Sequence, residues 1–183
     1  VLRRLIGAAG LERCIVFTDS TDPKRAEELA TFPGEIVRLP RQNRTLRRRL
    51  AKRLHKSMAG LGLRPPWRAP SVGQISKTAN LIAASAHDLD CLVACSGALT
   101  DIPVAAQAAS ASGARLILYI FDDYVGQQTH PAAATWALGV ERQAVGLASA
   151  VICPNEQLAM LYRARHGVEP TIVRNPIVGA GPA

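Results

Sequence analysis

Residues 90–124 of the chain read DCLVACSGALTDIPVAAQAASASGARLILYIFDDY, and this stretch carries the clearest indication of the fold class. It holds two short strand-like runs, Cys91–Cys95 and Arg115–Phe121, the second apolar after its first residue, and between them an Ala-rich segment, Asp101–Ser112, that ends at Gly113. Continuous apolar runs are typical of parallel strands covered on both faces, and a glycine commonly follows the last turn of a helix. The stretch therefore predicts a strand, a crossover helix and a second strand parallel to the first.

The same alternation extends along the chain in both directions. Further strands are predicted at Cys14–Thr18, Glu35–Leu39, Ala150–Cys153 and Thr171–Val173. Further helices are predicted at Pro23–Ala30, Thr45–Ala59, Val72–Ala86, Pro131–Ala148 and Asn155–His166. Alternating elements with short connections predict an α/β fold: a Rossmann-like open, mainly parallel sheet with helices on both faces. We expect a single domain over residues 1–177, followed by a tail or the start of an interdomain linker over residues 178–183.

Length and composition exclude several classes of protein. The 183 residues are 48% apolar and 20% charged, which are the proportions of a globular domain. No apolar stretch approaches the roughly 20 residues of a membrane-spanning helix, and residues 1–11 do not read as a secretory signal, so we expect a cytoplasmic protein. The four cysteines form no C-x-x-C pair and the four histidines are scattered, so we expect free thiols and no metal site.

Positive charge is concentrated in one segment. No acidic residue lies between Glu35 and Asp88, whereas this interval holds 12 of the 22 Lys and Arg residues. Within it, residues 44–60 have the spacing of an amphipathic helix, whose apolar side either packs on the sheet or lies at an anionic membrane surface, with Trp67 nearby for the headgroup region. Phosphates of nucleic acid rank lower, because aromatic residues are only 4% of the chain. The candidate membrane-surface residues are Arg44, Arg47, Arg48, Lys52, Arg53 and Lys56.

The fold class itself indicates where a ligand binds, because ligands of open parallel sheets lie beyond the carboxyl ends of the strands. The residues that follow predicted strands there are Ser96, Gly97, Asp122, Asp123, Asn155, Glu156, Arg174 and Asn175. The adjacent carboxylates after the fourth strand suit a base or a ligand for a sugar hydroxyl, although Asp at a strand end often only caps a turn. The Ser-Gly turn suits an anion or a hydroxyl, or is simply architecture. No G-x-G-x-x-G and no P-loop occurs.

Three motifs in the second half of the chain carry a resemblance to a known family. They are the strand Leu116–Phe121 with Asp122-Asp123-Tyr124 after it, the strand and turn Ala148–Glu156, and the segment Thr171–Ile177 with its Arg-Asn-Pro. In order and spacing they resemble the N-terminal domain of GT-B glycosyltransferases of the group 1, family 4 class, over roughly residues 90–177.

The resemblance implies an enzyme that moves a sugar from a nucleotide-sugar donor to an acceptor hydroxyl, with no further cofactor. This chain would be the acceptor-side half, without the family's first strand and without the C-terminal donor domain, and therefore inactive alone. The resemblance implies that Asp122 is the catalytic residue. It also implies that the substrates are bound by Ser96, Gly97, Asp123, Asn155, Glu156, Arg174 and Asn175. A lipid-linked acceptor in envelope polysaccharide or glycolipid synthesis would place the protein peripherally at the inner face of the membrane.

Two other classes of function fit the same residues. One is a non-enzymatic Rossmann-like module that binds nucleic acid or an acidic partner through Arg44–Arg68. The other is one half of a sugar-nucleotide epimerase, which ranks lower only because the motifs match the glycosyltransferases better. The first alternative predicts affinity that falls steeply with salt and is indifferent to Asp122.

Overall fold

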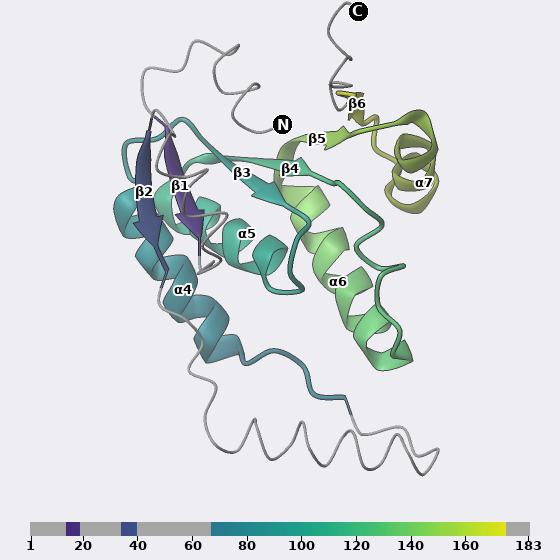
Figure 1. Cartoon of the computed structure of the whole chain (residues 1–183), viewed down its shortest axis with the longest axis horizontal. Coiled ribbons are helices and arrows are strands. Elements are labelled where there is room, and N and C mark those ends of the chain that lie inside the picture. Colours follow the sequence, from purple (N-terminus) through teal and green to yellow (C-terminus); the bar gives the residue numbers. More distant parts are fainter. Residues whose placement is uncertain (1–13, 19–33, 40–66, 175–183) are drawn as a thin grey trace, which may run out of the picture.

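The computed structural model describes residues 14–18, 34–39 and 67–174 (Figure 1). Its strands are β1 Ile15–Thr18, β2 Glu35–Arg38, β3 Cys91–Cys95, β4 Arg115–Tyr119, β5 Ala148–Cys153 and β6 Thr171–Ile172. Its helices are α4 Val72–Ser85, α5 Asp101–Ser112, α6 Pro131–Leu147 and α7 Glu156–His166. The α/β class is therefore confirmed, and each of these elements lies within two residues of its predicted bounds. The predicted helices Pro23–Ala30 and Thr45–Ala59 lie outside the described residues, as do the six candidate membrane-surface cations and residues 178–183.

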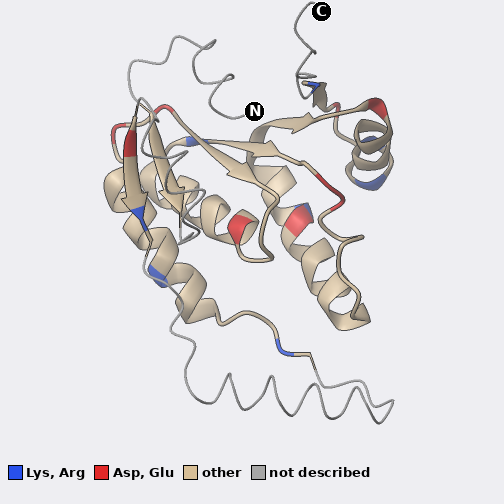
Figure 2. Cartoon of the chain, in the orientation of Figure 1, with Lys and Arg blue, Asp and Glu red and all other residues tan. Residues whose placement is uncertain are grey.

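All strand pairs of the described part are parallel, as predicted, but the strands form two sheets instead of one. The smaller sheet pairs β1 with β2, and the larger has the order β3-β4-β5-β6. β3 and β5 carry no charged residue (Figure 2). This composition is typical of parallel strands that are covered by other elements of the fold. A single open sheet was expected, whereas among the described residues no hydrogen-bond ladder joins β1 to β3.

The described helices gather on one side of the larger sheet. From β3 to β6 the order of the strands in the sheet is the same as their order along the chain. Because crossovers between parallel strands are right-handed, the connecting helices α5, α6 and α7 then lie on the same face of the sheet. Figure 1 shows α4, α5 and α6 below the four-stranded sheet. Helices on both faces were predicted, and the described part shows the helical layer of one face.

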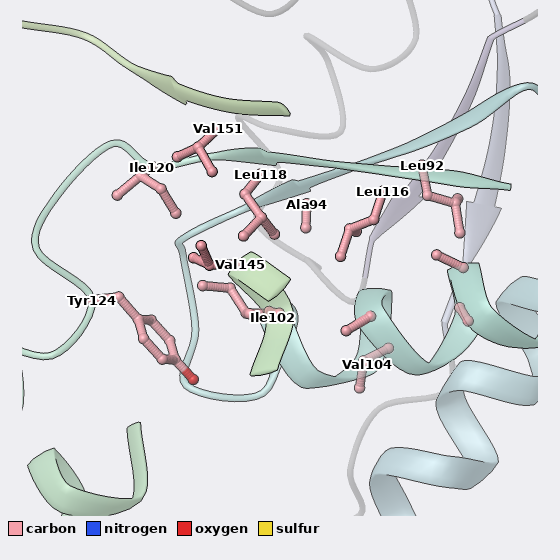
Figure 3. Packing of buried hydrophobic residues seen from close by; sticks show 14 of the residues in the cluster. Leu92, Ala94, Ile102, Val104, Leu116, Leu118, Ile120, Tyr124, Val145 and Val151 are labelled. Atoms are coloured by element: carbon pink, nitrogen blue, oxygen red, sulfur yellow. The ribbon is translucent and has the colours of Figure 1, made fainter. Parts of the chain in front are cut away.

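The core lies between this layer and the larger sheet. Leu92 and Ala94 of β3 and Leu116 and Leu118 of β4 point toward the helices and are buried, whereas Val93 on the opposite face is 49% exposed (Figure 3). The helix α5 buries the small residues Ala106, Ala108 and Ala109, which let neighbouring elements approach its backbone closely. Ile102 of α5 lies between the helix and the two strands, whereas Val104 is buried on the other side of α5 (Figure 3).

Glycines end two of the helices in the way that the sequence predicts. Gly113 follows α5 with φ of 77° and Gly167 follows α7 with φ of 69°, both in the left-handed region. Each donates its N–H to a carbonyl four residues earlier. A side chain at either position would strain the backbone, so glycine is the residue that lets the chain leave the helix toward the next strand.

Candidate functional site

The carboxyl ends of β3, β4 and β5 lie side by side. Cys95 is in register with Tyr119, and Tyr119 with Ile152, so the three strands end at nearly the same level. The segments that begin at Ser96, Phe121 and Pro154 therefore meet along one edge of the sheet, as the fold class predicts. In Figure 2 acidic positions mark the loop after β4 and the helices α5 and α6 next to it.

Ser96 joins two strand ends. Its side chain is buried, with 3% of the residue exposed, and its Oγ accepts a hydrogen bond from the N–H of Phe121 at 2.9 Å. Its own N–H donates to the carbonyl of Tyr119 at 3.2 Å. This predicted substrate-binding residue thus fixes the start of the loop that carries Asp122 and Asp123.

In the turn after β3, a carboxylate side chain accepts a backbone N–H of the same turn. Oδ2 of Asp101, in the first turn of α5, accepts the N–H of Ala98 at 2.5 Å. Gly97 is exposed, and a Cβ there would lie 2.9 Å from the same oxygen. The sequence left two interpretations of this turn, a place for an anion or a hydroxyl and simple architecture, and in the structure a carboxylate of the chain already accepts the N–H of Ala98.

The two adjacent carboxylates after β4 differ in their surroundings. Asp123 forms a two-point ion pair with Arg165, with Nη1–Oδ1 at 2.8 Å and Nη2–Oδ2 at 3.0 Å, and Oδ1 also accepts the N–H of Val125 at 3.1 Å. Hydrogen bonding from Arg165 outweighs partial burial and holds the pKa of Asp123 below its usual range. Asp122 is exposed, and it makes no hydrogen bond or ion pair within the described part of the chain. Asp123 therefore shapes the loop, and Asp122 is left facing solvent.

Tyr124, the residue after Asp123, fixes the loop after β4 to the core. Tyr124 is almost completely buried, and its hydroxyl donates to the carbonyl of Leu99 at 2.5 Å. Burial, followed by the nearby Asp101 and Glu141, raises the pKa of Tyr124, so the phenol remains a neutral donor. The loops after β3 and β4 are thus joined twice, at Ser96 and at Tyr124.

Arg165 also belongs to a buried ionic cluster that sequence reasoning missed. Glu141 of α6 is 0% exposed, and its carboxylate accepts from Arg165 Nη1 at 2.9 Å and from the Tyr162 hydroxyl. His166 Nε2 lies 2.6 Å from Glu141 Oε1. A signal was present in the sequence, because Glu141 interrupts the otherwise apolar stripe of α6 that includes Ala137 and Ala144. A carboxylate at such a position needs a buried cationic or hydroxyl partner.

The charge states of the cluster follow from its contacts. Hydrogen bonds to Asp123, and then to Glu141, raise the pKa of Arg165, which is 19% exposed, so its guanidinium stays charged. Burial, and then the charge of Glu141, raises the pKa of Tyr162, which therefore keeps its proton and donates it to the carboxylate. The cluster connects α6, α7 and the loop after β4.

Three more of the predicted site residues, Asn155, Glu156 and Arg174, lie further along the same edge, after β5 and β6. Asn155 caps α7, because its Oδ1 accepts the N–H of Leu158 at 2.8 Å. Glu156 and Arg174 form an exposed ion pair with each other. Asn175 lies outside the described residues. The structure thus brings Ser96, Gly97, Asp122 and Asp123 together, and it gives Asn155 a capping role.

The cysteines and aromatic rings take structural positions. All four cysteines are free, and burial, followed by a neighbouring acidic residue, raises the pKa of Cys95 and of Cys153 to about 11, so neither is a ready nucleophile. Trp67, expected at a headgroup region, lies 6.4 Å from His130 and 6.2 Å from Trp136, measured between ring centroids. His130 caps α6 by accepting the N–H of Ala132 at 3.2 Å.

Two further properties concern the described residues only. No group of three His, Cys, Asp or Glu side chains among them has the arrangement of a metal site. None of their helices has the length and apolar character of a membrane span.

Comparison of the chain with protein-family models, with curated proteins and with solved structures found no match. What the protein does must therefore be inferred from the arrangement of its own residues.

Proposed function

We propose that the chain is the acceptor-side half of a GT-B type glycosyltransferase, in which Asp122 receives the acceptor hydroxyl. The observation that carries the proposal is the solvent-facing carboxylate of Asp122 beside the fixed Asp123, at the carboxyl edge of a parallel sheet. The three sequence motifs described above supply the choice of reaction. The nucleotide-sugar donor is assigned chiefly to a second domain.

The neighbouring carboxylates suit this chemistry because they are not equivalent. Arg165 neutralises Asp123, so Asp122 is the one whose charge faces solvent. A carboxylate at this place accepts a hydrogen bond from the acceptor hydroxyl and orients its oxygen toward the anomeric carbon. In an inverting transfer the oxygen forms the new glycosidic bond, the bond to the diphosphate breaks, and Asp122 takes the hydroxyl proton.

The test is sugar transfer by the chain fused after Ile177 to the donor domain of a GT-B glycosyltransferase, with labelled UDP- and GDP-sugars and a panel of saccharide acceptors. Asp122→Asn keeps the shape of the side chain and removes its charge. Asp90→Asn is the matched control, because Asp90 is exposed at the opposite end of β3. We expect transfer by the fusion, an approximately 100-fold or greater loss with Asp122→Asn, and no loss with the control.

Two outcomes contradict the proposal in different ways. Equal transfer by the Asp122→Asn and Asp90→Asn variants would leave the reaction class intact and remove the role of Asp122. No transfer with any donor and acceptor pair, despite a correctly folded fusion, would remove the reaction class. Salt-dependent binding to nucleic acid that is indifferent to Asp122 would favour the binding-module alternative.

A second part of the proposal concerns the membrane, and it rests on the charge of the sequence. The cations Arg44, Arg47, Arg48, Lys52, Arg53 and Lys56 are proposed to hold the protein at an anionic surface, each contributing about 1 kcal/mol. We expect the chain to sediment with vesicles that contain phosphatidylserine and not with neutral phosphatidylcholine vesicles. Replacing Arg47, Arg48, Lys52 and Arg53 by Glu should abolish the difference. Equal sedimentation with both vesicle types contradicts the electrostatic part.

A further inference from the structure

Asp122 lies between two residues that other parts of the fold hold in place. On one side, the N–H of Phe121 donates to Oγ of the buried Ser96 at 2.9 Å. On the other side, both carboxylate oxygens of Asp123 accept from Arg165. Because the peptide bond is planar, each residue has only two soft backbone dihedrals, so anchoring both neighbours leaves Asp122 little backbone freedom. Arg165 therefore sets one of the two boundaries of the exposed carboxylate.

The guanidinium of Arg165 is fixed in its plane by two carboxylates. Its Nη1 lies 2.8 Å from Asp123 Oδ1 and 2.9 Å from Glu141 Oε1, and its Nη2 lies 3.0 Å from Asp123 Oδ2. Its Cζ also lies 5.8 Å from the centroid of the Tyr162 ring, within the range of a cation–π contact. A planar fork can meet these partners together, whereas a lysine ammonium in the same place is a single point charge. The arrangement therefore requires arginine and not only a cation.

Glu141 holds Arg165 from the helical layer. It belongs to α6, is 0% exposed, and accepts the hydroxyl of Tyr162 as well as Nη1 of Arg165. The Nε2 of His166 lies 2.6 Å from Glu141 Oε1, and that histidine side chain is 2% exposed. A side chain with this packing and these contacts has little rotamer freedom, so it gives Arg165 a fixed support. Arg165 on α7 thereby connects the loop after β4 to a rigid position on α6.

We propose that Arg165 and Glu141 are positioning residues of the transfer reaction. Glu141 fixes the guanidinium of Arg165, and Arg165 fixes Asp123. The loop held in this way sets where the Asp122 carboxylate meets the acceptor hydroxyl. This role rests on the function proposed above, whereas the fixing of the loop does not. Asp123 then holds the loop instead of contacting the acceptor, in contrast to the substrate-binding role that the resemblance implies.

The proposal predicts a specific kinetic effect. Positioning residues do not touch the acceptor, so its binding should change little when the cluster is altered. A displacement of the reacting group by about 1 Å, in contrast, can cost about 100-fold in rate. We therefore expect kcat to fall while KM stays nearly constant. Since the effect passes through Asp122, it should disappear in a variant that already lacks the Asp122 carboxylate.

The first experiment follows the loop in the 183-residue chain by hydrogen–deuterium exchange. Two amides report on Asp123 directly, because the N–H of Val125 donates to its Oδ1 at 3.1 Å and that of Gln127 donates to its carbonyl at 2.9 Å. We expect Arg165→Lys to speed exchange at both amides about tenfold or more. The amides of residues 116–119 in β4 are the internal reference, because they report general destabilisation of the fold.

Arg163→Lys is the matched control. Arg163 lies on the same helix and its ion pair with Glu169 is exposed, so we expect no change at the two loop amides. Unchanged exchange there in Arg165→Lys rejects the positioning role, and equal acceleration in the loop and in β4 would show a role in stability alone. If Arg165→Lys does not fold, Asp123→Asn is measured by the same criteria, because it leaves the pair of Arg165 and Glu141 in place.

The second experiment measures transfer by the fusion described above. We expect Arg165→Lys and Glu141→Gln each to lower kcat about 30-fold or more and to leave KM within about twofold of the parent. Combined with Asp122→Asn, Arg165→Lys should cause no further loss. A raised KM with unchanged kcat, or an additive loss in the double variant, contradicts positioning through Asp122. No transfer by the parent fusion removes the proposed reaction, and the exchange experiment still decides whether Arg165 fixes the loop.

Discussion

Arg165 binds two carboxylates that come from different elements, Asp123 in the loop after β4 and Glu141 on α6. Glu141 is completely buried, and a buried charge is costly unless it is paired and hydrogen-bonded. Three donors surround its two oxygens when His166 presents its Nε2–H, so its hydrogen-bonding capacity is well used. At the scale of single residues, Arg165 links the stability of the helical layer to the shape of the candidate site.

Removing this cation should destabilise the fold strongly. Arg165→Met keeps much of the apolar stem and leaves Glu141 without its guanidinium partner, so we expect the free energy of unfolding to fall by about 3–5 kcal/mol. Urea denaturation followed by circular dichroism measures the change. Arg163→Met on the same helix is the control, because its ion pair with Glu169 is exposed and should contribute little. Equal effects of the two substitutions would show that the cluster does not contribute to stability.

Asp123 should make the stability of the protein depend on pH in the acid range. Hydrogen bonding from Arg165 lowers its pKa in the folded state, so the ionised carboxylate stabilises the fold above the unfolded value of about 3.9. That contribution is lost as the pH falls through the lower, folded-state pKa. We expect Asp123→Asn to be less stable than the parent at pH 7 and to lose less stability between pH 5 and pH 2.5, as measured by urea denaturation. Parallel loss in both proteins would contradict the assignment.

For single residues, the sequence predicted where a side chain lies in the fold better than which side chain it contacts. Asp122 and Asp123 were placed at the sheet edge because Asp after an apolar run marks a strand end, and the structure puts them there. Their different roles could not be predicted, since the partner of Asp123 lies 42 residues away on α7. Local patterns carry no information on which of several arginines packs against a given loop.

At the scale of elements, α7 is preceded by Asn155, which was expected to bind substrate and which caps the helix. Asn155 stands before an 11-residue helix, and its side chain satisfies the N–H of Leu158. The other end of the helix is closed by Gly167. Both terminal signals are local in the sequence, which is why the bounds of α7 were predicted within one residue.

The capping role gives a direct test of Asn155. Asn155→Ala should lower the free energy of unfolding by about 1 kcal/mol, whereas Asn155→Asp, which also caps well, should leave it nearly unchanged. Thermal or urea denaturation measures both. In the fusion described above, a substrate contact made by the amide N–H₂ would be lost in both variants. A stable Asn155→Asp variant with undiminished transfer would therefore assign Asn155 to the helix alone.

The strand bounds that differ from prediction have physical causes. β4 ends at Tyr119 and not at Phe121, because the N–H of Phe121 turns to Ser96 Oγ. β5 begins at Ala148, two residues before the predicted start, because α6 passes into it without a loop and Ala148 already has an extended backbone. Apolar composition alone does not reveal either change, since each depends on contacts with another segment.

At the scale of the whole molecule, two parallel sheets share one helical layer. Phe17 of β1 and Leu39 after β2 pack against the same core as the larger sheet. The direction of every strand was predictable, because alternating β and α elements with right-handed crossovers permit little else. The division into two sheets was not, because strand order depends on which edges meet and no local pattern records it.

The division predicts unequal stability within the molecule. β4 has a neighbour on each side, whereas β1 and β2 form a pair, and a two-stranded unit is marginal without further support. We expect amides of residues 15–18 and 35–38 to exchange about tenfold or more faster than those of residues 116–119 in native-state hydrogen exchange. Exchange at a common rate under all denaturant concentrations would instead show that both sheets open together.

The carboxylate of Asp101 has a consequence for what the sheet edge can hold. Because it already occupies the N–H of Ala98 beside Gly97, an incoming phosphate would meet like charge and a donor in use. An uncharged polyol does not meet this charge repulsion. The turn therefore disfavours a phosphate at this place, and an uncharged sugar is the better fit for the acceptor that we propose.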